Sequence, residues 1–108
     1  MTVPPFDRAR LQLAADTKEE EDELLALFFH GAEAKIGEME KALAHADWVD
    51  WQHAAHYLKG SAANLGMQLL FEKCKQAEAN DSPSKASAAP LLDDIKMELQ
   101  RIKDYIAS

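Results

Sequence analysis

The sequence DWVDWQHAAHYLKGSAANLG, residues 47–66, has the apolar spacing of an amphipathic helix. Its apolar residues recur at steps of three or four positions and so share one helix face; they are Trp48, Trp51, Ala55, Leu58, Ala62 and Leu65. Asp47 is a natural N-cap, and Gly66 occupies a place where a left-handed C-cap is common. We therefore predict a helix over these residues, with one face in a hydrophobic core.

A longer helix is predicted before this one, from Thr17 to about Ala46. Thr17 can cap the helix, and Glu20 stands at the third helical position, as in a capping box. The apolar stripe of this helix is expected to comprise Leu25, Phe28, Ala32, Ile36, Met39, Leu43 and Ala46. A short leading helix is expected within residues 6–15.

Two more helices are predicted after Gly66. The first, over residues 67–80, would bury Leu70, Phe71, Cys74 and Ala77. The segment NDSPSKASAAP, residues 80–90, is expected to be a loop, with a turn of helix possible at residues 85–89. The last helix follows Pro90 and would bury Leu92, Ile95, Leu99, Ile102 and Ile106, leaving Lys96, Glu98, Arg101 and Lys103 in solvent.

These helices predict an all-α fold, an antiparallel up-down four-helix bundle preceded by the short helix. Strand-type alternation is absent from the sequence. At 108 residues the chain is expected to form one domain, with residues 1–16 as an N-terminal segment and residues 17–108 as the bundle.

Composition excludes several classes of function. The formal charge of −7 disfavours nucleic acid as a partner, because phosphate binding needs a basic face. Cys74 is the only cysteine, which excludes an internal disulfide and a thiolate metal cluster. No apolar run approaches the roughly 18 residues of a membrane span, and the first residues lack a secretory signal. We expect a cytoplasmic monomer that binds no membrane and has no metal site.

The side of the 47–66 helix opposite its apolar stripe has an unusual composition. At about 100° per residue, His56 points roughly 140° away from the centre of the stripe. Lys59, Gly60 and Ala63 lie within about 60° of it. A lone exposed histidine is usually a surface residue, but Gly60 costs about 1 kcal/mol against Ala in a helix. An exposed imidazole, a cation and a cleared approach together suit phosphoryl transfer.

The segment HYLKGSAANLG, residues 56–66, is similar to the signature of histidine-containing phosphotransfer (HPt) domains. That signature is His, two residues, Lys-Gly-Ser or Lys-Gly-Ala, and a small stretch ending in Leu-Gly. Residues 24–51 resemble the preceding helix of the family with its ADW turn, and residues 69–78 resemble its following helix. The last helix agrees only in amphipathicity, so the resemblance covers about residues 20–80.

The resemblance implies roles for individual residues. His56 would be phosphorylated, Lys59 would stabilise the phosphoryl group, and Gly60 would admit the donor. Glu78 falls where the family often places Gln or Glu against the imidazole, and it would fix the orientation of the ring. Ser61 matches a small polar position of uncertain role. Weaker expectations for docking of a partner are Ala63, Asn64 and Met67.

The resemblance also implies the partners. These would be aspartyl-phosphate receiver domains of a hybrid sensor kinase or a response regulator, one as donor and one as acceptor. Since the chain has no nucleotide-binding loop, it would be a stoichiometric carrier and not an autokinase. It would need no cofactor of its own, and Mg²⁺ would belong to the receiver domain.

Other interpretations remain open from the sequence. The bundle could bind a receiver or a histidine kinase as an adaptor or inhibitor without accepting phosphate. A purely structural bundle would leave Gly60 unexplained, and an enzyme acting on a small molecule lacks an evident acid–base pair. His53, one turn before His56, could suggest a metal pair, but a zinc site usually needs three or four ligands.

Overall fold

A computed structural model of the chain describes residues 5–80 and 83–107, and within these residues all regular structure is helical. The five helices are α1 (Arg8–Ala14), α2 (Lys18–His45), α3 (Trp48–Asn64), α4 (Gln68–Glu78) and α5 (Lys85–Ala107). The predicted all-α class is therefore confirmed.

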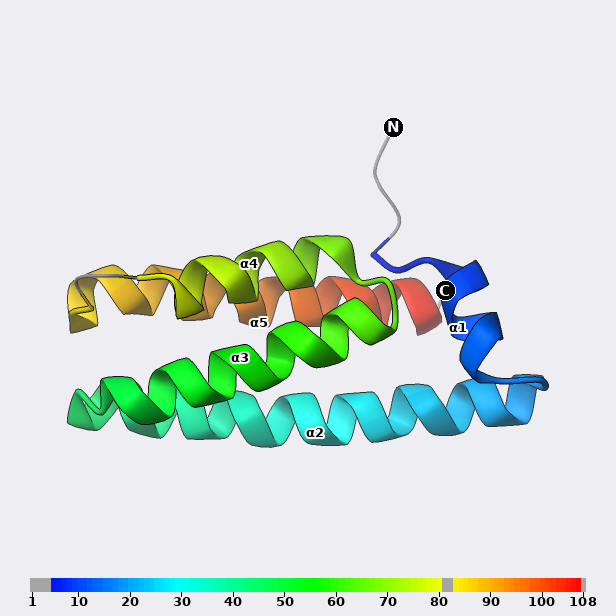
Figure 1. The fold of residues 1–108 in the computed structure, drawn as a ribbon, viewed down its shortest axis with the longest axis horizontal. Coiled ribbons are helices and arrows are strands. Elements are labelled where there is room, and N and C mark those ends of the chain that lie inside the picture. Colours follow the sequence, from blue (N-terminus) through cyan, green and yellow to red (C-terminus); the bar gives the residue numbers. More distant parts are fainter. Residues whose placement is uncertain (1–4, 81–82, 108) are drawn as a thin grey trace.

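The four longer helices lie side by side along the long axis of the molecule (Figure 1). Helix α3 packs against α2 and α4, and α5 packs against α4 and α2, so each of the four helices packs against two of the others. Figure 1 also shows that the chain direction reverses from each of these helices to the next, while α1 lies beside the start of α2. This arrangement places α3 between α2 and α4, with one face toward solvent.

The helix ends follow from local sequence. The Thr17 hydroxyl accepts a hydrogen bond from the Glu20 N–H at 3.2 Å, and the Asp47 carboxylate accepts one from the Asp50 N–H at 3.2 Å. Gly66 has a φ of 67°, as expected for a left-handed C-cap. Ala46 also has a positive φ, 54°, and ends α2.

The core differs from the predicted stripes at their margins. Ala46 is exposed because it lies in the left-handed turn after α2, so the prediction that it is buried is wrong. Leu43, Trp48, Phe71 and Ile106 are only partly buried and pack against the edge of the core. The other predicted stripe residues are buried, and Ala42 and Ala54 join them.

The start of α5 corrects a second prediction. The helix begins at Lys85 and continues through Pro90, so the turn of helix considered possible at residues 85–89 is the start of α5, and Pro90 does not close a loop. Ser84 and Ser87 start it reciprocally: the Ser87 N–H donates to the Ser84 hydroxyl, and the Ser84 N–H donates to the Ser87 hydroxyl. Pro90 is the sixth residue of this helix and lies inside it, where it lacks the N–H for one backbone hydrogen bond.

Glu98 corrects a third prediction, since it does not face solvent. Its side chain is 4% exposed, and its two oxygens accept hydrogen bonds from Arg101 Nε at 2.8 Å and Nη2 at 2.9 Å. A bidentate guanidinium one turn away neutralises the carboxylate and allows it to be buried. Helical periodicity alone places a charged side chain outside the core, and it does not include such a partner.

Helix α1 closes one end of the bundle. Phe6 and Leu11 are buried, and the Asp7 N–H donates to the Gly66 carbonyl at 3.2 Å. A Cβ atom at Gly66 would lie 2.9 Å from the Asp7 Cβ, so the close approach requires glycine there. The described part of the N-terminal segment is therefore packed against the bundle through Phe6 and Leu11.

Candidate functional site

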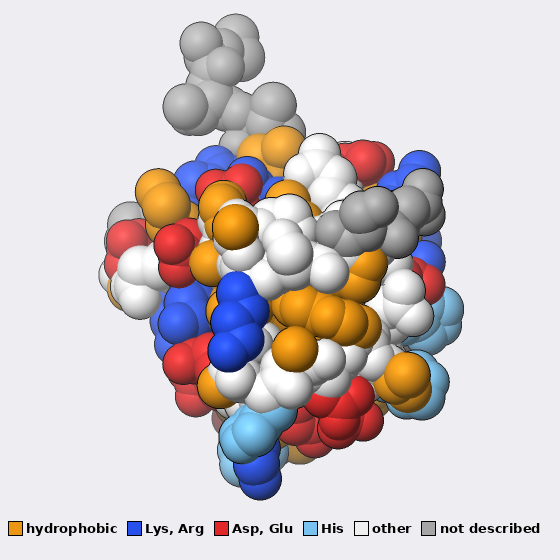
Figure 2. All heavy atoms as spheres, turned by 90° about the vertical axis from the view of Figure 1, so that its left-hand side faces the viewer, with side chains coloured by type: hydrophobic (Ala, Val, Ile, Leu, Met, Phe, Trp, Pro, Cys, Tyr) orange, Lys and Arg blue, Asp and Glu red, His pale blue; other side chains and the backbone are white. Residues whose placement is uncertain are grey.

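His56 lies on the solvent side of α3, and its side chain is 69% exposed. The opposite side of the helix is buried through Trp51, Ala54, Ala55, Leu58 and Ala62. The same helix therefore holds the core together and presents the imidazole. Figure 2 looks onto one end of the molecule. Histidine side chains lie at the surface there, at the bottom and on the right of the view.

Glu78, the last residue of α4, connects His56 and Lys59. Its Oε1 lies 2.9 Å from His56 Nδ1, and its Oε2 lies 2.7 Å from Lys59 Nζ. The side chains of Lys59 and Glu78 are 24% and 27% exposed, so this ion pair is partly shielded from water. The structure thus brings together three of the residues to which the resemblance gave a role, His56, Lys59 and Glu78.

A buried hydrogen bond holds α4 in this position. The indole Nε1 of Trp51 donates to the Ala77 carbonyl at 3.0 Å. Trp51 is fully buried, and Ala77 immediately precedes Glu78. Cys74, one turn before Glu78, is also buried, as predicted from the apolar stripe.

The contacts of Glu78 decide its charge and the tautomer of His56. The close ammonium of Lys59, together with the hydrogen bond from His56, holds the pKa of Glu78 below its ordinary value, although partial burial opposes this. An ionised carboxylate only accepts hydrogen bonds, which assigns the proton to His56 Nδ1. In the neutral ring the lone pair is then on Nε2, the nitrogen that Glu78 does not contact.

The Cys74 thiol also senses this charge. Burial, followed by the negative charge of Glu78, raises the pKa of Cys74 to about 12. Cys74 is therefore a neutral, buried side chain and not a reactive thiol.

Gly60 leaves open space beside His56. A Cβ atom built at Gly60 would meet no atom within 4 Å, so packing within the chain does not require glycine there. The same is true of Gly37 on α2, far along the sequence from the histidine. Gly60 is thus a helix-weakening residue without an internal packing reason.

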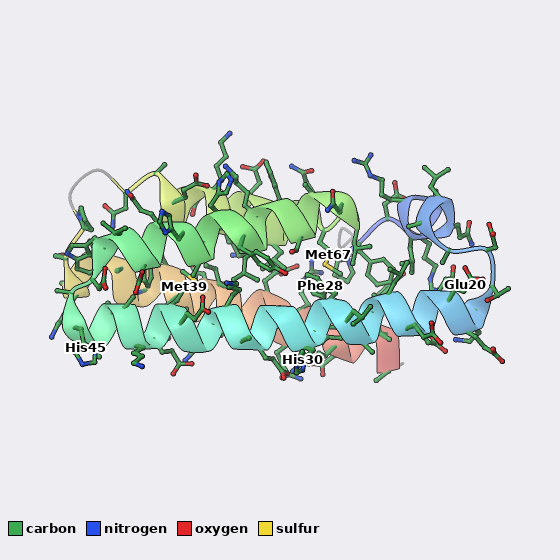
Figure 3. The ribbon with its side chains drawn as sticks, turned by 60° about the horizontal axis from the view of Figure 1, so that its bottom comes forward. Glu20, Phe28, His30, Met39, His45 and Met67 are labelled. Carbon is green, nitrogen blue, oxygen red and sulfur yellow. The ribbon has the colours of Figure 1, made fainter. Side chains whose placement is uncertain are left out.

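The remaining predicted site residues lie at the end of α3 or beyond it. Ser61 and Ala63 are partly buried and Asn64 is exposed. Met67 is fully buried and lies between the helices near Phe28 (Figure 3). The chain turns inward after Gly66 and takes this side chain into the core, and the expectation that Met67 contributes to docking stays a prediction.

Tyr57 is an exposed residue that the sequence argument did not single out. Its side chain is half exposed, and the Lys35 ammonium lies 4.6 Å from its ring centroid. Tyr57 lies against Gly31 of α2, where an added Cβ would be in ordinary contact with the Tyr57 hydroxyl at 3.7 Å. The available signal was its position about 100° around the helix from His56.

The other histidines lie outside the cluster of His56, Lys59 and Glu78. His53 is exposed one turn before His56. His30 and His45 lie on the outer side of α2 (Figure 3), and His45 Nδ1 lies 2.9 Å from the Lys41 carbonyl oxygen.

Among residues 5–80 and 83–107, no three His, Cys, Asp or Glu side chains are grouped so that they could hold a metal ion. No helix in the described part of the chain is long and apolar enough to cross a membrane.

Comparisons with known proteins agree with this geometry. A family model described as "Hpt domain" matches residues 23–105. The crystal structure of histidine-containing phosphotransfer protein B (HptB) from Pseudomonas aeruginosa PAO1 is similar, with a TM-score of 0.80 and 23% sequence identity. The match covers 99% of each chain, and at this identity it supports the fold alone. A search of the curated proteins found no match.

Proposed function

The chain belongs to the Hpt domain family, and on that premise we propose that His56 accepts a phosphoryl group from a receiver-domain aspartate and passes it to a second receiver. Members of this family are phosphotransfer carriers of phosphorelays, which the family match supports for this chain. The residue, the partners and the direction of flow are the parts that we propose.

The observation that carries the proposal is the contact of His56 with Glu78. Because Nδ1 is occupied at 2.9 Å by the Glu78 carboxylate, Nε2 is the nucleophilic nitrogen. The imidazole is exposed, and Gly60 leaves open space one turn along the helix. An incoming acyl phosphate therefore meets no side chain from position 60.

The neighbouring residues have distinct parts in the proposed reaction. Lys59 places a positive charge near the phosphoryl oxygens, and Gly60 provides clearance. Glu78 orients the ring. Ser61, Ala63 and Asn64 are proposed to contribute to the surface that the receiver covers.

The same proposal includes the coarser expectations about the molecule. We propose that α2–α5 form an up-down antiparallel bundle. The alternating chain directions in Figure 1 support this arrangement. We also propose that the protein acts as a cytoplasmic monomer and a stoichiometric carrier. Mg²⁺ is expected on the receiver domain, and no cofactor is expected on this chain.

The test is incubation of the chain with receiver domains carrying a labelled aspartyl phosphate. We expect acid-labile label on the wild type and on His53→Gln, the matched control one turn away, but none on His56→Gln. Label on His56→Gln at the wild-type rate would contradict the proposal. Tight binding of a receiver without label on the wild type would instead favour an adaptor or inhibitor.

A further inference from the structure

A groove lies between α1 and the end of the bundle where α3 passes into α4 (Figure 1). Its volume is about 690 Å³, which falls within the range of small-molecule sites, roughly 300–1,000 Å³. Residues 6–8 and Arg10 line one side of it. The other side consists of residues from the end of α3 and the start of α4, together with Tyr105 of α5.

The part of the groove nearest the core is apolar. Phe6, Ala62 and Met67 are buried there, and Phe71 is partly buried. The rings of Phe6 and Tyr105 meet edge to face, with 5.4 Å between their centroids. An apolar chain in the groove would therefore leave water for aromatic and aliphatic surface, which is favourable.

Two exposed arginines lie at the opening of the groove, Arg8 and Arg10. The Arg8 guanidinium lies 5.6 Å from the centroid of the Phe6 ring, so its charge stands directly beside the apolar lining. Within residues 5–80 and 83–107, neither arginine forms an ion pair with a carboxylate. The groove thus offers two guanidinium groups that are available to an anion.

The carboxylate in the lining is that of Asp7, and it is already used. Its Oδ1 accepts a hydrogen bond from the Ala9 N–H at 2.9 Å, which caps α1. The lining therefore carries two positive charges against one negative charge. This local excess of positive charge contrasts with the formal charge of −7 of the whole chain.

We propose that this groove binds a small amphiphilic carboxylate of the fatty-acid class, with its chain on the apolar lining and its carboxylate at Arg8 and Arg10. Guanidinium groups suit a carboxylate because their N–H donors can bind both of its oxygens. The apolar lining makes no use of an inorganic anion, and the arginines make none of an uncharged chain. The site does not include His56, so the inference goes beyond the proposed function and does not depend on it.

The first test is a titration of the ¹⁵N-labelled full chain with sodium decanoate below its micelle-forming concentration, followed through the amide signals. We expect saturable shifts confined to residues 6–10, residues 62–71 and the end of α5, equally in the wild type and in His56→Gln. Each CH₂ removed from the chain, down to octanoate and hexanoate, should weaken binding about fourfold. Shifts that do not saturate, or that spread over the whole bundle, would overturn the proposal.

The head group is tested with ligands and with arginine variants. Decanol and decyltrimethylammonium should bind at least about tenfold more weakly than decanoate. The double variant Arg8→Gln/Arg10→Gln should weaken decanoate binding about tenfold, and Arg8→Lys/Arg10→Lys should retain most of it. The control Lys75→Gln/Lys85→Gln removes two exposed cations outside the groove and should bind as the wild type does. Equal affinities in the two glutamine variants would refute the role of the arginines.

The position of the chain is tested by filling the groove. Ala63→Phe adds a ring to the lining and should weaken decanoate binding about tenfold. Ala34→Phe adds the same ring at an exposed position of α2 and should leave it unchanged. Unchanged affinity in Ala63→Phe would place the ligand elsewhere and overturn the proposal. Binding to anionic phospholipid vesicles without binding of decanoate would also overturn it, in favour of a membrane surface.

Discussion

Glu78 and Glu98 are both ion-paired carboxylates on helices of the bundle, but they are paired in opposite ways. Glu98 is 4% exposed and gives both oxygens to one residue of its own helix, Arg101. Glu78 is 27% exposed and divides its oxygens between two residues of another helix, His56 and Lys59. The first pair is closed within α5, whereas the second links α4 to an exposed imidazole.

The difference separates an interaction that permits burial from one that controls a reactive group. A buried carboxylate must be neutralised by its partner, so the loss of that partner costs stability. A partly exposed carboxylate contributes little stability, because water screens its interactions. The main effect expected of Glu78 is therefore on His56 and not on the stability of the fold. Four predictions follow this contrast from the largest expected effect to the smallest.

Removing Arg101 tests the closed pair. Arg101→Met should lower the free energy of unfolding by about 3 kcal/mol, because it leaves Glu98 buried without its bidentate cation. Urea denaturation measures this. Lys103→Met is the matched control, since its partner Glu33 is exposed, and it should cost less than about 1 kcal/mol. Equal losses of stability in the two variants would mean that the buried and the exposed ion pair do not differ.

A second prediction concerns the space beside His56, on the exposed face of α3 next to the cluster of His56, Lys59 and Glu78. Gly60→Gln should slow transfer from a phosphorylated receiver by about 10²-fold, because a side chain there displaces the incoming phosphate. Gly37→Gln, also made in open space on a helix, should transfer at the wild-type rate. Both should be as stable as the wild type or more stable, by up to about 1 kcal/mol. A full rate in Gly60→Gln would rule out the clearance role.

Cys74 reports on the charge of Glu78. Its pKa is about 12 in the folded chain against an ordinary 9.0, so its contribution to stability is complete below pH 9 and is lost as the pH rises toward 12. Between pH 9 and about pH 10.5 the wild type should lose about 2 kcal/mol more stability than Cys74→Ala. Urea midpoints at the two pH values measure this loss. Glu78→Gln should reduce it and Glu98→Gln should not; parallel curves for wild type and Cys74→Ala would contradict the assignment.

The smallest expected effect is that of Glu78 itself on stability. Glu78→Gln should change the free energy of unfolding by less than about 1 kcal/mol at neutral pH, because the pair is partly exposed. The lowered pKa of Glu78 makes this contribution present above its ordinary 4.5 and lost as the pH falls through the folded value. Thermal unfolding at neutral and acidic pH would show the difference vanish in acid. A loss as large as that of Arg101→Met would make Glu78 a structural residue.

The sequence predicted what depends on near neighbours. The caps at Thr17 and Asp47 and the left-handed turn at Gly66 involve atoms within a few positions, and all are present. The exposed face of α3 followed from helical angles alone. The helix boundary at Pro90 was predicted wrongly, because α5 continues through this proline although proline inside a helix is unfavourable.

What depends on contacts between distant residues was not predictable in the same way. The burial of Met67 follows from how α4 meets the core. Glu98 is a different case, because its partner Arg101 is only one turn away, but helical periodicity does not indicate that such a pair is buried. Family resemblance pointed to Glu78 as a partner of His56. The division of its two oxygens depends on how closely α3 and α4 approach, which periodicity does not contain.

The hydrogen bond from Trp51 to the Ala77 carbonyl has a consequence for the accuracy of the site. Neighbouring residues of a helix point about 100° apart, so a rotation of α4 by one residue would turn Glu78 away from His56. The hydrogen bond from the indole to the Ala77 carbonyl favours one rotation of α4 about its axis relative to α3. The rotation of α4 relative to α3 is thus fixed by a buried residue, which a protein that docks on the surface does not contact.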